Sequence, residues 1–180
     1  MPNQQNEQTH NTSHQMLKTI FTTGLVLASA FAYSQDVVDI AIGSKDHTTL
    51  VTAVKAADLV GTLKSKGPFT VFAPTNAAFD KLPEGTVAGL LKPESKAALS
   101  GILTDHVVAG NMDAAAVVAA IKGGKGKAVL TTVNGAKLTA SMKGDKVILT
   151  DAKGGMATVT ATDLKGTNGM VHVIDTVVMP

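Results

Sequence analysis

The sequence predicts an α+β fold in which several helices pack against a largely antiparallel sheet. Apolar residues recur at helical spacing through the first half of the chain, whereas residues 128–179 divide into short strand-like runs. An Asn134-Gly135 pair separates two of these runs and is a typical hairpin turn. The chain has 180 residues, of which 44% are hydrophobic and 17% charged, and this suits a single packed core.

The first helices are indicated by their caps. Asp36 is a favourable N-cap for a short helix that ends at Gly43. A second helix begins near Thr48, and its apolar face continues to Leu63. Gly67-Pro68 then breaks the pattern.

A strand and a short helix follow this break. Residues 69–72 are rich in aromatic and β-branched side chains, which favour a strand, and Pro74 ends it. Thr75 or Asn76 then caps a short helix through Phe79.

Three further helices are predicted before the strand-rich half. Pro83 and Pro93 each suit the first turn of a helix. The second of these helices carries one apolar face, formed by Leu99, Ile102, Leu103 and His106. Asp113 opens an alanine-rich helix that ends at Gly123-Gly124.

The second half predicts five strands, which cover residues 128–133, 137–142, 146–150, 157–162 and 170–179. Residues 143–146 form a second turn, between the second and third of these strands. Short connections of this kind predict antiparallel neighbours.

The N-terminal segment has the pattern of an export signal. A basic start at Lys18, an apolar run over residues 20–31 and small residues before Ala32 and Ser34 predict a signal peptide over residues 16–34, cleaved after one of those two residues. The apolar run is too short to span a membrane; the alternative is a buried N-terminal helix. Residues 1–15 are polar and patternless, and we interpret them as a non-native or mis-assigned extension before a start at Met16.

Composition excludes several classes of function. The chain has no cysteine, so disulfides, thiolate metal sites and a lipoprotein anchor are excluded. All 16 basic residues are lysines and the net charge is only +2. The guanidinium forks and aromatic platforms that grip nucleic acid are therefore missing, and no nucleic-acid partner is expected.

Two long segments resemble the boxes of a known family. Residues 67–79, GPFTVFAPTNAAF, and 168–180, NGMVHVIDTVVMP, are similar to the first and second boxes of the fasciclin (FAS1) family. Residues 102–108 between them resemble its Tyr-His segment, except that Asp105 stands where the family usually has tyrosine. The resemblance covers residues 36–180 and carries the following motif residues, interpreted as mainly structural: Thr70, Phe72, Pro74, Thr75, Asn76, Phe79, His106, Asn168, Gly169, His172 and Asp175.

The resemblance implies a compact β-sandwich-like core with several helices around it. It also implies an exported protein, in the periplasm, outside the cell or on its surface. Family members serve in adhesion and matrix contact, and some bind apolar ligands such as carotenoids. No general catalytic activity comes with the family.

The residues themselves give no catalytic or metal pattern. His47, His106 and His172 form no HxH or HExxH spacing, and no GxSxG elbow is present. We therefore expect no enzyme activity, metal or cofactor. His106 and His172 lie among apolar residues and are expected to be buried and hydrogen-bonded, while Asn76 and Asn168 are expected to supply local turn and cap geometry.

Two functions remain open. The first is a non-catalytic module that contacts a cell-surface or matrix protein or polysaccharide. Its contacts would lie on loops, at Asp105, His106, Lys122, Lys125 and Lys127 and at the two hairpin turns. The alternative is an extracytoplasmic carrier of an apolar small molecule such as a carotenoid.

Overall fold

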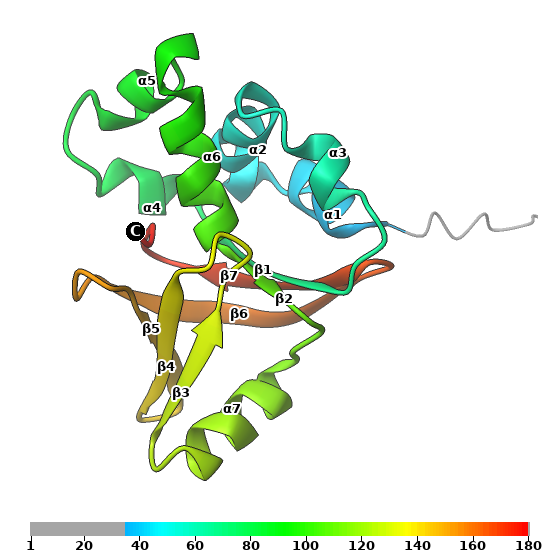
Figure 1. Cartoon of the computed structure of the whole chain (residues 1–180), viewed down its shortest axis with the longest axis vertical. Coiled ribbons are helices and arrows are strands. Elements are labelled where there is room, and N and C mark those ends of the chain that lie inside the picture. Colours follow the sequence, from blue (N-terminus) through cyan, green and yellow to red (C-terminus); the bar gives the residue numbers. More distant parts are fainter. Residues whose placement is uncertain (1–34, 180) are drawn as a thin grey trace, which may run out of the picture. The chain divides into compact units, whose positions relative to one another are not determined.

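A computed structural model of the chain describes residues 35–179 (Figure 1). The predicted signal peptide and the extension before it lie outside the described residues. No helix within the described part has the length and hydropathy needed to cross a membrane.

Seven α-helices and two 3₁₀ turns lie in the first two thirds of the described chain. They are α1 (Val37–Gly43), η1 (Lys45–His47), α2 (Thr48–Ala56), α3 (Val60–Leu63), α4 (Asn76–Asp80), α5 (Thr86–Leu90), η2 (Pro93–Ser95), α6 (Lys96–Asp105) and α7 (Ala114–Gly123). Helices α1 to α6 gather on one side of the sheet, whereas α7 lies apart from them beside β3 and β4 (Figure 1).

Seven strands form one mixed sheet. They are β1 (Phe69–Pro74), β2 (Val107–Ala109), β3 (Lys127–Thr131), β4 (Lys137–Lys143), β5 (Lys146–Thr150), β6 (Met156–Gly166) and β7 (Gly169–Ile174). Their order is β2-β1-β7-β6-β5-β4-β3. The β1–β7 pair is parallel and every other pair is antiparallel, so the α+β prediction is confirmed.

The two ends of the sheet approach each other. Val108 of β2 forms an isolated antiparallel bridge with Thr132, which follows β3. The Val133 N–H donates to the Val107 carbonyl oxygen at 2.7 Å. The sheet therefore curls into a nearly closed barrel.

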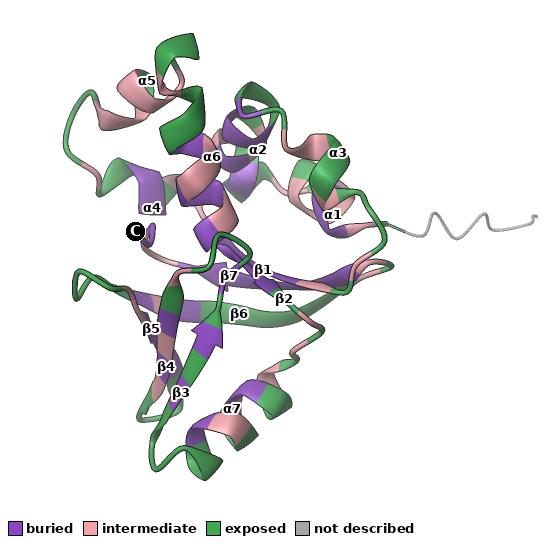
Figure 2. Cartoon of the chain, viewed as in Figure 1, coloured by how far each residue is buried: buried purple, intermediate pink, exposed green. Residues whose placement is uncertain are grey.

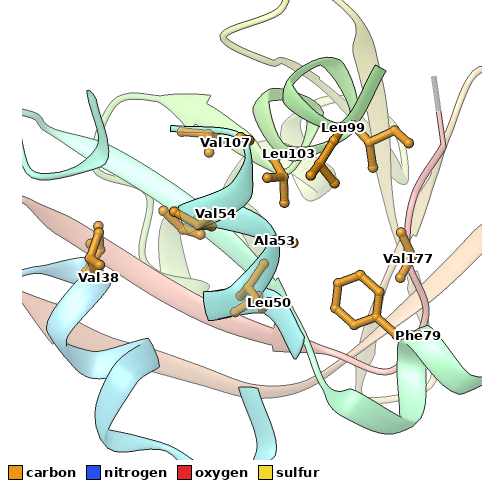
Figure 3. Close-up of a cluster of buried hydrophobic side chains, with 14 of the residues drawn as sticks. Val38, Leu50, Ala53, Val54, Phe79, Leu99, Leu103, Val107 and Val177 are labelled. Carbon is orange, nitrogen blue, oxygen red and sulfur yellow. The ribbon is translucent and has the colours of Figure 1, made fainter. Parts of the chain in front are cut away.

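Two buried clusters pack on the two sides of the central strands. Helices α1, α2, α4 and α6 bury one cluster against β1, β2 and β7 (Figure 3), and Leu50, Phe79 and Leu103 belong to it. The second cluster fills the space between the curled sheet and α7, where Leu138 and Ile121 are almost inaccessible. Strands β1 and β7 lie between the two clusters and are buried on both faces (Figure 2).

Local chemistry explains most element boundaries. The Asp36 carboxylate accepts hydrogen bonds from the Val38 and Asp39 N–H groups, so the predicted cap of α1 is confirmed. The helix predicted from Thr48 to Leu63 is instead two helices. Asp58 interrupts it with a φ of 60°, a left-handed conformation that an α-helix cannot contain.

The strand boundaries also differ in places. Strand β7 ends at Ile174, not at residue 179, because the chain turns away to pack Val177 and Val178 into the two clusters. Strand β6 extends four residues beyond the predicted end at 162 through two irregularities in its pairing with β7. Strand β2 was not predicted, because its three residues are too few for a periodic pattern.

Candidate functional site

The two family-like segments lie side by side in the centre of the sheet. Strand β1 pairs with β7 in parallel register from Phe69–Gly169 to Pro74–Ile174. A Cβ at Gly169 would overlap the Phe69 carbonyl oxygen, so only glycine permits this approach. The two segments therefore form one structural unit although they are far apart in the chain.

Asn168 ties that unit to the first helices. Its Oδ1 accepts from the Val37 N–H at 3.0 Å, at the start of α1. Its Nδ2 donates to the carbonyl oxygens of Leu63 and Ser65 at 2.7 and 3.1 Å, at the end of α3. One side chain thus satisfies unpaired backbone groups at two helix ends.

Asn76 makes a similar connection on the other side. Its Oδ1 accepts from the Thr49 N–H and the Thr48 hydroxyl in the first turn of α2, and its Nδ2 donates to the Lys45 carbonyl oxygen. Of the two predicted alternatives, Thr75 and not Asn76 caps α4, through the Ala78 N–H. The long-range contacts of Asn76 and Asn168 were not predicted, because their partners are distant in the sequence.

Thr70 and His172 hold the segment that leads into α7. The Thr70 hydroxyl donates to the Gly110 carbonyl oxygen and accepts from the Met112 N–H. His172 Nε2 donates to the Met112 carbonyl oxygen at 2.8 Å, and its ring stacks on Phe72 with centroids 5.6 Å apart. Each of these side chains is buried.

His106 connects the end of α6 with the C-terminal segment. Its Nδ1–H donates to the Ile102 carbonyl oxygen at 2.7 Å, and its Nε2 accepts from the Val178 N–H at 3.1 Å. The second contact requires an unprotonated Nε2. Burial lowers the pKa of His106, which favours the same neutral ring.

Asp105 is also buried, with 2% of its surface exposed. Its Oδ1 accepts from the Thr132 hydroxyl and the Asn134 amide, which follow β3. Its Oδ2 has no hydrogen-bond partner among the described residues. Since the Asp105 and His106 side chains face the interior, the structure does not support the predicted contact role of these two residues.

Asp175 joins β6 to the residues that follow β7. Its Oδ1 accepts from the Thr158 N–H at 2.8 Å and from the Thr176 hydroxyl. Burial alone would raise the pKa of this carboxyl, but these hydrogen bonds and the charge of Lys81 hold it below its usual value. Asp175 is therefore ionised at neutral pH.

The family model of the fasciclin domain matches residues 45–180 of this chain. This chain belongs to the fasciclin domain family. Protein sll1483 of Synechocystis sp. is 43% identical over 164 residues, which cover 91% of this chain and 84% of that protein. The cell surface glycolipoprotein MPB83 of Mycobacterium bovis is 40% identical over 126 residues, or 68% of this chain and 48% of that protein.

A solved structure shows the same fold. The FAS1 domain pair of the insect cell adhesion molecule fasciclin I matches with a TM-score of 0.72 and 16% identity. The match covers 81% of this chain and 51% of the pair. The predicted fasciclin resemblance and fold are thereby confirmed.

The lysines predicted to contact a partner lie at one end of the fasciclin sheet. Lys122 is in the last turn of α7, Lys125 is in the following loop, and Lys127 begins β3. All three are exposed. Within residues 35–179, no carboxylate lies within 4.0 Å of the ammonium group of any of these three lysines.

A narrow apolar groove lies beneath the first helices of the fasciclin domain. Its walls come from α1, α2, α3 and β1, and include Val38, Val54, Leu63 and Val71. Its volume of about 30 Å³ is small beside the roughly 300 Å³ or more of typical ligand pockets. Ile42 at its rim is 50% exposed.

A wider cleft of about 510 Å³ opens where β1 and β7 begin. Lys64, Lys66, Asn111 and Thr167 contribute polar side chains to it, and its lining contains no histidine or carboxylate. Within residues 35–179, no cluster of three histidine, aspartate or glutamate side chains could hold a metal ion.

Proposed function

We propose that this fasciclin domain is an exported, non-catalytic module that acts by contact with a cell-surface or matrix protein or polysaccharide. The main support is how its motif residues are used. Thr70, Asn76, Asn168, His106 and His172 direct their hydrogen bonds into the domain. The recognisable segments thus build a scaffold, and binding falls to the exposed loops and strands.

The relatives agree with this proposal. MPB83 is described as a cell surface glycolipoprotein, and fasciclin I as a cell adhesion molecule. Both descriptions place related domains where contact between surfaces matters.

Adhesion of the native host's cells tests the proposal. Cells that lack the protein should attach less well to a surface or to one another, and the purified protein should restore attachment. A variant with Lys122, Lys125 and Lys127 changed to Ala should restore less, because these exposed charges meet the partner. Equal attachment with and without the protein would contradict the proposal.

Export has its own test. Intact mass spectrometry of the protein from outside the cytoplasm should give an N-terminus at Tyr33 or Gln35, as the small residues before Ala32 and Ser34 predict. Exported protein that retains residues 1–32 would contradict it.

The apolar groove favours a second function, the carriage of an apolar small molecule. Fifteen mainly aliphatic residues line it, but its small volume requires α1 and α2 to separate before a ligand enters. Protein purified from the native host would then carry the ligand, and a carotenoid would colour it. Colourless protein with no extractable apolar compound would remove this alternative.

A further inference from the structure

Charge is divided unevenly over the described residues. Residues 122–153, which end α7 and form β3, β4 and β5, contain seven lysines and two aspartates, a formal charge of +5. The rest of residues 35–179 contains eight lysines and eleven carboxylates, a formal charge of −3. The small net charge of +2 therefore conceals two oppositely charged parts.

Ion pairing follows the same division. All four ion pairs of the described chain lie in the negative part, where Lys64, Lys81 and Lys96 contact aspartates. Within the described residues, none of the seven lysines of residues 122–153 has a carboxylate within 4.0 Å. Their ammonium groups are therefore free to contact solvent or a partner.

Strand register concentrates five of these lysines at one end of the sheet. Lys143 and Lys146 are direct cross-strand partners at the β4–β5 turn, where like charges destabilise the pair. Lys127 begins β3 at the same end, since β3 and β4 are antiparallel, and Lys122 and Lys125 immediately precede it (Figure 1). Asp145 in the turn is the one carboxylate among them.

The same end presents a partly exposed sheet face, on which the lysines are exposed, the three hydroxyl residues are half-buried and Ile148, opposite Ser141, is 8% exposed. Successive side chains of a strand point to opposite faces of the sheet, and Leu130, Leu138 and Leu149 point inward to the cluster under α7. The outward positions include Lys127, Lys143 and Lys146, followed by Ser141, Thr139 and Thr150. In the described structure none of these three hydroxyl groups has a protein hydrogen-bond partner, and neighbouring Val129 is 61% exposed.

We propose that this outward face binds a linear polysaccharide that carries carboxylate groups. We call it the lysine face and define it by Lys127, Lys143, Lys146, Ser141, Thr139 and Thr150. The inference rests on the proposed contact function and specifies its partner.

The chemistry of the lysine face matches such a polymer. Lysine ammonium groups pair with carboxylates, and the free hydroxyls exchange hydrogen bonds with sugar hydroxyls. The face carries no aromatic side chain on which nucleic-acid bases could stack. Repeated carboxylates along a polymer allow several modest contacts at once.

Binding of the exported chain to immobilised polygalacturonate tests the inference, with neutral dextran as the reference polymer. The variant K127Q/K143Q/K146Q should lose about ten-fold in affinity, because three exposed ion contacts are removed. The matched variant K45Q/K66Q/K92Q changes the net charge equally, at exposed lysines outside the face, and should bind within about two-fold of the unchanged protein. Equal losses in both variants would overturn the proposal.

A second variant tests the sugar contacts. T139V/T150V removes two hydroxyls without changing charge, so it should weaken binding while the salt dependence stays the same. Unchanged affinity in this variant, or equal affinity for single-stranded DNA, would overturn the assignment to a polysaccharide. Self-association that the triple variant abolishes, without polymer binding, would assign the face to a second copy of the chain and also overturn it.

The adhesion assay separates this inference from the proposed function. Adhesion that persists in K127Q/K143Q/K146Q overturns the lysine face and leaves the contact function standing. Polymer binding by a protein that has no effect on adhesion supports the lysine face and contradicts the contact function.

Discussion

His106 uses both ring nitrogens to hold separate parts of the chain together. The Nδ1–H bond to Ile102 ends α6, and the bond from the Val178 N–H to Nε2 fixes the segment after β7. Protonation would place a second N–H opposite the Val178 donor and introduce an unpaired buried charge. The neutral imidazole is therefore part of the folded structure.

Replacement of His106 should change how stability depends on pH. The pKa of His106 is lowered from 6.5 in the folded state by burial, and that of His47 likewise. The unfolded chain thus takes up protons first, so the free energy of unfolding is highest above pH 6.5 and falls below it. Each histidine contributes at most about 1.4 kcal/mol per pH unit.

H106Q should lose less stability than the unchanged protein between pH 7.5 and 5.0, and at pH 7.5 it should be about 1–3 kcal/mol less stable. Urea unfolding at the two pH values measures both effects. Asp36 and Asp175 do not interfere, since their pKa values lie below 3.8 and matter only in stronger acid. Parallel pH curves for H106Q and the unchanged protein would contradict this account.

Single residues show where the sequence alone was insufficient. The motif residues were recognisable, and the expected burial and hydrogen bonding of His106 and His172 agree with the structure. Asp105 was expected at the surface, but the residues after β3 fold over it and supply two donors. A contact of this kind depends on tertiary packing, which no local pattern encodes.

At the scale of elements, the β1–β7 pair requires a residue without a side chain, Gly169. Gly169 lies so close to the Phe69 backbone that any Cβ would force the strands apart. Because β7 is also the neighbour of β6, such a displacement would disturb the middle of the sheet.

G169A should therefore destabilise the domain by about 3 kcal/mol or more. The matched change G101A, inside α6 with open space around its new Cβ, should stabilise it by about 0.5–1 kcal/mol. Thermal or urea unfolding of the two variants measures the difference. Similar stability for both would show that the β1–β7 approach is not sterically limited.

Elements with strong local signals were predicted best. The caps at Asp36, Thr75 and Asp113 lie at the starts of real helices, and Asn134-Gly135 lies in the connection between β3 and β4, although β3 ends at Thr131 and not at residue 133. Strand β2 and the division between α2 and α3 were missed. Strand β2 forms because it pairs with β1, and the division between α2 and α3 arises from the left-handed conformation of Asp58. Neither feature produces a periodic pattern in the sequence.

At the scale of the whole described domain, two contacts join the ends of the sheet. The bridge from Val108 to Thr132 and the bond from the Val133 N–H to Val107 connect β2 with the chain after β3. The sequence predicted the class of fold but not this closure, because strand order depends on contacts between distant segments.

Loss of the hydrogen bond from the Val133 N–H to the Val107 carbonyl oxygen should weaken the connection between the two ends of the sheet. V133P removes the N–H donor and should cost about 1–3 kcal/mol, whereas V133T keeps the donor at a position that is 46% exposed and should be nearly neutral. In the unchanged protein, the Val133 amide should exchange its hydrogen slowly despite its exposed side chain. Rapid exchange at Val133 would show that the ends of the sheet are not joined in solution.

The central position of β7 also determines when the domain can form during synthesis. Strand β1 receives its parallel partner only when residues 169–174 have left the ribosome, after every other strand of the sheet has been made. Until then the middle of the sheet is incomplete, and contacts between such distant segments form slowly. The domain therefore cannot complete its sheet until β7 has been made, whichever helices and hairpins form before it.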